Sequence, residues 1–205
     1  MLLTRLQANK TDKFTSGLLR FICTLCVVHK TDLTPDVAVS MLDGVQPQPG
    51  LFAQVMPVLL PEVPKTPLKD RKLVSVGLTN LLTRSTTMIN SPHVNVWPTI
   101  LAALLKLFLL PLPVTSSNVV QEDEIDLADE EALSYQASFS RLGASEKPKA
   151  DPVPQVTDVK AYLANELARL SNEKPGQVQH MMNAAGQDLV APFMEYVSSL
   201  GLTIA

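Results

Sequence analysis

Cys23 and Cys26 form a C-x-x-C pair, the first pattern in this 205-residue chain whose residue types and spacing could support chemistry. Such a pair can act as a redox couple or as half of a zinc site. The chain holds two cysteines in all, so no second pair completes a zinc site, and no βαβ pattern surrounds this one. On a helix the two side chains share one face, where free cysteine packs like a small apolar residue. We therefore expect buried thiols in a reducing compartment, with the redox or metal half-site as the alternative.

The other residue types that carry out catalysis are scattered along the sequence. His29, His93 and His180 are far apart, and none is followed by a second histidine or cysteine three or four residues later. The serines lack the G-x-S-x-G pattern of a nucleophile elbow, and both glycine-rich phosphate-binding patterns are missing from the sequence. We therefore expect no enzyme and no catalytic, cofactor-binding or metal-binding residues.

The composition favours a folded helical protein. Hydrophobic residues make up 46% of the chain and charged residues 18%, which excludes a wholly disordered polypeptide. Aromatic residues reach 5%, while Leu, Val and Ala abound, a balance that favours helix over sheet. The net charge of −3 does not suit bulk attraction to nucleic acid.

Apolar residues at helical spacing predict a succession of helices. Thr34-Pro35, Thr66-Pro67 and Ser91-Pro92 are helix start signals, with the hydroxyl residue as cap and Pro in the first turn. Gly44 should close one helix in the left-handed conformation, and Pro57 should kink or interrupt another. Helix pairs then recur about every forty residues, the period of two-helix solenoid repeats.

The most apolar helix is predicted over residues 94–110, and it must be covered on more than one side. We do not expect membrane insertion, because Lys106 and several prolines interrupt a stretch that is shorter than the roughly 20 residues a bilayer needs. Trp97 near its start is expected in the core, with an interface anchor as the alternative. Three further helices are predicted near residues 158–172, 178–185 and 188–200, and the final pair should cap the stack.

Two charged clusters are candidates for contact with another protein. Residues 121–131 form an acidic run without a basic residue, and a basic partner would contact Glu122, Asp123, Glu124 and Asp126. The alternative is a solvated loop that keeps the protein soluble. A basic cluster early in a predicted helix contains Lys69, Arg71 and Lys72, and here a solvated face is the simpler interpretation.

The order of these segments also carries a family resemblance. The apolar helix, the acidic run and a short aromatic helix over residues 134–142 follow one another directly. Shorter pieces fit in the same order: residues 3–7, 13–14, 23–26, 43–47, 60–62, 76–82 and 151–153. Together they resemble the far C-terminal end of the exportin-2 family, the cellular apoptosis susceptibility family of nuclear export receptors for importin-α.

The resemblance implies an all-α fold, a HEAT-type α-solenoid in which antiparallel helix pairs stack as a right-handed superhelix. We expect helical repeats over residues 1–111, an acidic connector over 112–133, and C-terminal repeats with a cap over 134–205. A family member is several times longer, so Met1 is not expected to be the native start.

The resemblance further implies a non-enzymatic scaffold that shuttles between nucleus and cytoplasm. As part of the full-length receptor it would bind importin-α and Ran-GTP, and alone it should not support export. The alternatives are a helical-repeat interaction module unrelated to nuclear transport and a truncated homologue without export activity.

Overall fold

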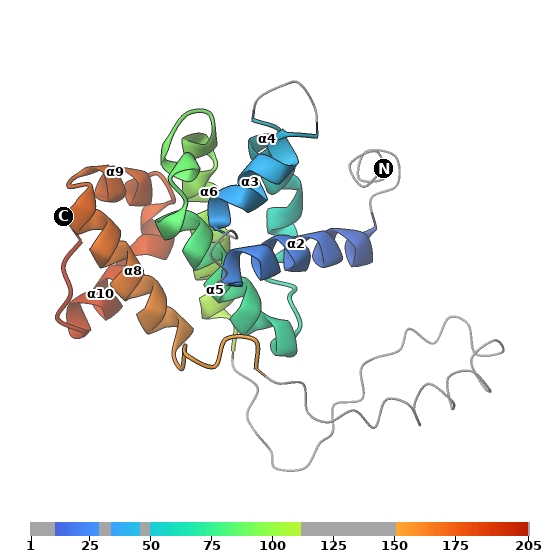
Figure 1. Ribbon diagram of the computed structural model, residues 1–205. Coiled ribbons are helices and arrows are strands. Elements are labelled where there is room, and N and C mark those ends of the chain that lie inside the picture. Colours follow the sequence, from blue (N-terminus) through green and yellow to red (C-terminus); the bar gives the residue numbers. More distant parts are fainter. Residues whose placement is uncertain (1–10, 29–33, 46–49, 112–150, 205) are drawn as a thin grey trace, which may run out of the picture. The chain divides into compact units, whose positions relative to one another are not determined.

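The computed structural model describes residues 11–28, 34–45, 50–111 and 151–204 (Figure 1). Every regular element in these ranges is an α-helix or a short 3-10 helix, as expected for an all-α fold. The elements are α2 (Asp12–Val27), α3 (Pro35–Asp43), α4 (Leu51–Leu59), η1 (Leu60–Glu62), α5 (Leu68–Arg84), η2 (Thr87–Ile89), η3 (His93–Asn95), α6 (Trp97–Leu109), α8 (Val159–Glu173), α9 (Gln177–Asn183) and α10 (Gln187–Ser199).

The chain divides into two compact units. Met1–Pro111 and Val153–Ala205 make up the first, and Leu112–Pro152 make up the second. The predicted acidic connector over residues 112–133 and the predicted helix over 134–142 lie outside the described residues. The division into repeats, connector and C-terminal repeats therefore stays a prediction.

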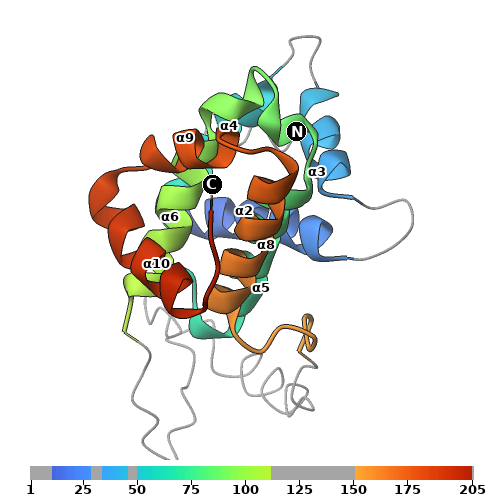
Figure 2. The same ribbon diagram turned by 90° about the vertical axis from the view of Figure 1, so that its left-hand side faces the viewer.

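Within the first unit the helices are layered. Figure 1 shows α5 and α6 in the middle, with α2, α3 and α4 on one side and α8, α9 and α10 on the other, and Figure 2 views the same helices from the side of α8, α9 and α10. Helix α2 packs on α5, α5 packs on α8, and α6 packs on both α9 and α10. This layering agrees with a HEAT-type α-solenoid, in which each layer packs on its neighbours.

Some predicted helix ends are confirmed and others are wrong. Thr34-Pro35 begins α3 as predicted, whereas Ser91-Pro92 leads into the 3-10 helix η3 and α6 begins only at Trp97. Asp158 caps α8 by accepting hydrogen bonds from the backbone N–H groups of Lys160 and Ala161. Gly44 does end α3, but with a φ of −74° it is right-handed, so the predicted left-handed closure is wrong. Helix α5 is capped by Pro67 and not by Thr66, because the proline carbonyl accepts the first helical hydrogen bonds.

The predicted interruption at Pro57 is not found. Helix α4 continues through Pro57 to Leu59, where it passes into the 3-10 helix η1. Proline lacks only the N–H that would bond four residues back, so the helix can go on beyond it.

Helix α6 has the burial that its apolar sequence requires. Ile100, Leu101 and Leu104 are completely buried among α5, α9 and α10. Trp97 is also completely buried, and its indole N–H donates to the Leu82 carbonyl at 3.0 Å, so the core interpretation is confirmed. Among the described residues, no helix combines the length and apolarity that crossing a bilayer requires.

Helices α2 and α5 approach each other closely at Gly77. A Cβ atom placed on Gly77 would lie 2.6 Å from the Cys23 Cβ and 2.7 Å from the Cys23 carbonyl oxygen. Both helices are fixed by other contacts, so only glycine permits this distance. Gly77 therefore determines how tightly the first two layers pack.

We expect Gly77→Ala to lower the free energy of unfolding by about 1–3 kcal/mol, because the added methyl group must push two backbones apart. Gly17→Ala is the matched control, since a Cβ on Gly17 in α2 meets nothing within 4 Å. That change should stabilise the protein by about 0.5–1 kcal/mol through helix propensity. Urea unfolding followed by circular dichroism measures both, and equal effects of the two substitutions would contradict the close-packing argument.

Candidate functional site

Helix α5 packs against α2, α6 and α8, and it is buried along most of its length. Residues 73–83 are all buried, and they include four polar residues: Ser75, Thr79, Asn80 and Thr83. Thr79 and Thr83 donate their hydroxyl protons to backbone carbonyls four residues earlier, at 2.8 Å each. These local bonds satisfy hydroxyl groups that no water reaches.

Asn80 joins three helices at one point. Its side-chain N–H donates to the Cys26 carbonyl at the end of α2, at 2.9 Å. Its side-chain oxygen accepts the hydroxyl proton of Tyr162 from α8, at 2.7 Å. Asn80 is completely buried, so replacing it would leave the groups it bonds without their partner.

The C-x-x-C pair is packed inside the same region. Cys23 is completely buried and Cys26 is 3% exposed, which confirms the prediction of buried thiols. Burial raises the pKa of Cys23 well above its ordinary value, and burial followed by the nearby Asp36 charge raises the pKa of Cys26 to about 12. Both thiols therefore stay protonated at neutral pH, and a protonated thiol is a poor nucleophile and metal ligand.

Asp36, at the start of α3, holds the segment that follows α5. Its carboxylate accepts hydrogen bonds from the hydroxyl groups of Ser85 and Thr86 and from the backbone N–H groups of Thr86 and Thr87. Burial alone would raise the pKa of Asp36, but these bonds outweigh it and lower the pKa to about 2. Asp36 also lies in the first turn of α3, at the positive end of the helix dipole.

Glu166, in α8, binds the end of α5 from the opposite side. Arg84 donates from Nε and one terminal nitrogen to the two Glu166 oxygens, at 3.1 and 2.8 Å. Arg169 donates to Glu166 at 3.0 Å and to the Thr83 carbonyl at 3.0 Å, and it also pairs with Glu173. Burial would raise the pKa of Glu166, but the hydrogen bonds from the two arginines lower it.

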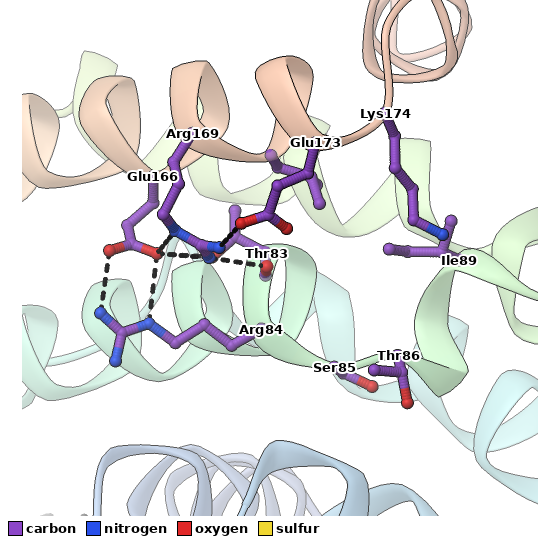
Figure 3. Close-up of a pocket in the computed structure, with 10 residues that line it drawn as sticks. Thr83, Arg84, Ser85, Thr86, Ile89, Glu166, Arg169, Glu173 and Lys174 are labelled. Atoms are coloured by element: carbon purple, nitrogen blue, oxygen red, sulfur yellow. Dashed lines mark hydrogen bonds and ion pairs between the residues drawn. The ribbon is translucent and has the colours of Figure 1, made fainter.

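A groove of about 450 Å³ lies where these two sets of contacts meet, between residues 83–89 and α8. Figure 3 shows Glu166, Arg169 and Glu173 pointing from α8 towards Arg84, while Lys174 lies opposite Ile89. The acidic and basic side chains of the groove are mostly paired with one another. These charged side chains thus hold the end of α5 to α8.

Of the histidines that the structure describes, His93 is buried and bonded, and His180 is exposed. His93 is buried, its Nε2 lies 2.7 Å from the Asp43 carboxylate, and its ring packs against Phe52. Asp43 also accepts the backbone N–H of Phe52 at 2.8 Å. His180 is exposed and His29 lies outside the described residues. In the part of the chain that the structure describes, His, Cys, Asp and Glu nowhere gather in threes that could hold a metal ion.

The structure describes one of the two predicted contact clusters. Glu122, Asp123, Glu124 and Asp126 lie outside the described residues. Lys69 is exposed in the first turn of α5, and Lys72 is partly buried. Arg71 is used internally, because its Nε donates to the Thr66 carbonyl at 3.2 Å. Partner contact by either charged cluster stays a prediction.

Sequence reasoning missed the residues that organise this region. Glu166, Arg169 and Glu173 are spaced three and four apart on a predicted helix, a signal that could have marked a charged face. Asn80 within an apolar helical pattern was a second signal. Their partners, Arg84 and Tyr162, are some eighty residues away in the chain and have no local signal.

The family described as CAS/CSE protein, C-terminus, matches residues 1–196 of the chain. The chain belongs to this family. The match includes each helix from α2 to α9 and most of α10.

The relatives of this CAS/CSE chain include proteins named exportin-2 and importin-alpha re-exporter. Exportin-2 of Homo sapiens is 31% identical over 188 residues, which cover 90% of this chain and 18% of that protein. Exportin-2 of Xenopus laevis is 32% identical over 189 residues, with the same coverage. The importin-alpha re-exporter of Schizosaccharomyces pombe is 31% identical over 186 residues, covering 89% of this chain and 19% of that protein. The chain therefore spans less than a fifth of the length of these curated relatives.

We expect Asp36→Asn to reduce stability in a pH-dependent way. The pKa of Asp36 is lowered to about 2 in the folded protein, so the unfolded chain takes up the proton first as pH falls. The stability that the carboxylate contributes is therefore complete above about pH 4 and disappears towards pH 2. Because the side chain is partly exposed, we expect a loss of about 1 kcal/mol at pH 7.

Urea unfolding of the original and variant proteins at pH 7 and near pH 2 measures this difference. Asp188→Asn is the control, since Asp188 is exposed in the first turn of α10. A loss that stays constant between the two pH values would contradict the assignment to the Asp36 carboxylate.

Proposed function

We propose that this chain is the C-terminal scaffold portion of a nuclear export receptor that returns importin-α to the cytoplasm together with Ran-GTP. The family match over residues 1–196 carries the proposal. The relative named importin-alpha re-exporter supports the cargo, at 31% identity over 89% of the chain. A chain of this extent corresponds to less than a fifth of the relatives' length. The whole receptor would bind both partners.

The contacts inside the described part of the chain favour a scaffold over an enzyme. Its two cysteines are protonated and buried, and its buried histidine is paired with Asp43. The polar side chains at the layer boundaries bond to one another and to backbone carbonyls. Such bonds hold helices together, and each of these polar groups already has a partner within the protein. We therefore propose that the chain has no catalytic activity.

The same function implies that the protein shuttles between nucleus and cytoplasm. A stack of layers that pack on their neighbours suits repeated binding and release, because small changes in packing angle at each boundary add up along a long stack. A receptor built this way can change its curvature when it binds and releases its partners.

A chimera tests the proposal directly. In the S. pombe importin-alpha re-exporter, this chain replaces the matching part, and binding to importin-α and GTP-locked Ran is measured by analytical gel filtration. We expect the chimera to form the ternary complex, whereas this chain alone forms no tight ternary complex. The re-exporter without the replaced part is the control.

Two results would favour the alternatives. A folded chimera that binds neither partner would favour a helical-repeat module unrelated to nuclear transport. A chimera that binds both partners but does not restore importin-α export in cells would favour a truncated homologue without export activity.

The acidic run gives a separate prediction within this proposal. Replacing Glu122, Asp123, Glu124 and Asp126 by Gln and Asn should leave the melting temperature unchanged, because exposed charges contribute little to stability. If the run contacts a basic partner, the chimera should associate more slowly and lose much of its salt dependence. Stopped-flow association at low and physiological salt measures this.

Replacing Asp188 and Glu195, two exposed acidic residues of α10, is the control for a general change of charge. An association rate that is unchanged at low salt would assign the acidic run to solubility alone.

A further inference from the structure

Thr86 lies between α5 and η2, and it is exposed. Its hydroxyl group donates to the Asp36 carboxylate at 2.9 Å, and its backbone N–H donates to the same carboxylate at 3.2 Å. The neighbouring hydroxyl residues differ, because Ser85 is completely buried and Thr87 is partly buried. Within residues 85–87, Thr86 therefore combines an accessible hydroxyl group with a direct contact to α3.

The Asp36 carboxylate could not tolerate a second negative charge at this position. Burial would raise the pKa of Asp36, but its hydrogen bonds lower the pKa to about 2, so the carboxylate stays ionised at neutral pH. A phosphate on Thr86 would carry about −1.5 to −2 charges, and its oxygens would replace a hydroxyl donor by acceptors. Like charges at hydrogen-bond distance repel each other, so the phosphate and the carboxylate could not stay in contact.

The groove beside α8 offers the opposite charge. Thr86 lines this groove together with three basic residues: Arg84, Arg169 and Lys174. Figure 3 shows Thr86 and Lys174 at opposite edges of the groove. Arg84 binds Glu166 through Nε and one terminal nitrogen, and its other terminal nitrogen takes no part in that pair. A phosphate that Asp36 repels would therefore find counter-charges in the groove, where charge-assisted hydrogen bonds are strong.

We propose that Thr86 is a phosphorylation site and that its phosphate releases residues 85–87 from α3. A Ser/Thr kinase transfers the γ-phosphoryl group of ATP: phosphorus forms a bond to Thr86 Oγ1, ADP leaves, and the hydroxyl proton goes to the base of the kinase. Arg84, two residues before the acceptor, is the residue type that arginine-directed kinases select. Phosphorylation thus weakens the contact between α3 and the end of α5, whereas the contact of Glu166 with Arg84 stays in place.

Hydrogen exchange of the full chain with phosphothreonine genetically encoded at position 86 tests the release. We expect amide exchange in α3 to become at least about tenfold faster, because the charge repulsion removes the bonds that Asp36 accepts. Thr86→Val removes only the hydroxyl donor and should have a smaller effect. Phosphothreonine at position 99 is the control for added charge, since Thr99 is exposed in the first turn of α6. It should leave the exchange of α3 unchanged.

The same comparison in an Asp36→Asn background identifies the cause. A neutral amide does not repel the phosphate, and its NH₂ group can donate to phosphate oxygens. Phosphorylation of Thr86 should therefore no longer accelerate exchange in α3. Acceleration of equal size in both backgrounds would overturn the proposal, and so would exchange that phosphorylation leaves unchanged in the original background.

A second measurement modifies the chain after it has folded. The catalytic subunit of cAMP-dependent protein kinase, an arginine-directed enzyme, is added with ATP to the folded chain and to a peptide of residues 80–92. We expect mass spectrometry to find phosphate on Thr86 in both, and Arg84→Gln to slow labelling of the peptide by about tenfold. A peptide labelled at Thr86 beside a folded chain that is not would overturn the proposal, as would a peptide that stays unlabelled at Thr86.

Discussion

The burial of polar groups on α5 is the constraint on which the other contacts depend. Helix α5 has four polar residues at buried positions: Ser75, Thr79, Asn80 and Thr83. Such a helix can lie between two layers only if each polar atom has a hydrogen-bond partner. The threonines bond within the helix, whereas Asn80 bonds to α2 and α8 at once. Among the described residues, no buried side-chain nitrogen or oxygen lacks a hydrogen bond. Asn80 therefore fixes both the position and the rotation of α5 relative to its neighbours.

The end of α5 repeats this principle with charged groups. Asp36 from α3 holds the segment that leaves the helix, and Glu166 with Arg169 from α8 binds its last turn. The two carboxylates have lowered pKa values because hydrogen-bond donors surround them. Apolar packing between layers is compatible with many small rotations, but charge-assisted bonds are directional. The charged contacts thus set one register for layers that the apolar core alone would leave less defined.

These observations agree with a scaffold whose function lies in its faces. The interior is occupied by structural pairs, and the groove beside α8 is lined by charges that mostly neutralise one another.

By itself, the sequence determined the helical class, most helix positions and the buried state of Trp97 and the two cysteines. These features follow from local spacing and apolarity, which a linear pattern contains. It did not predict that Pro67 would cap α5, that Gly44 would be right-handed, or that Gly77 would contact Cys23. Nor did it pair Asn80 with Tyr162 or Arg84 with Glu166, since about eighty residues separate each pair. Only the tertiary structure decided these, because packing distant helices together creates the geometry in which such groups meet.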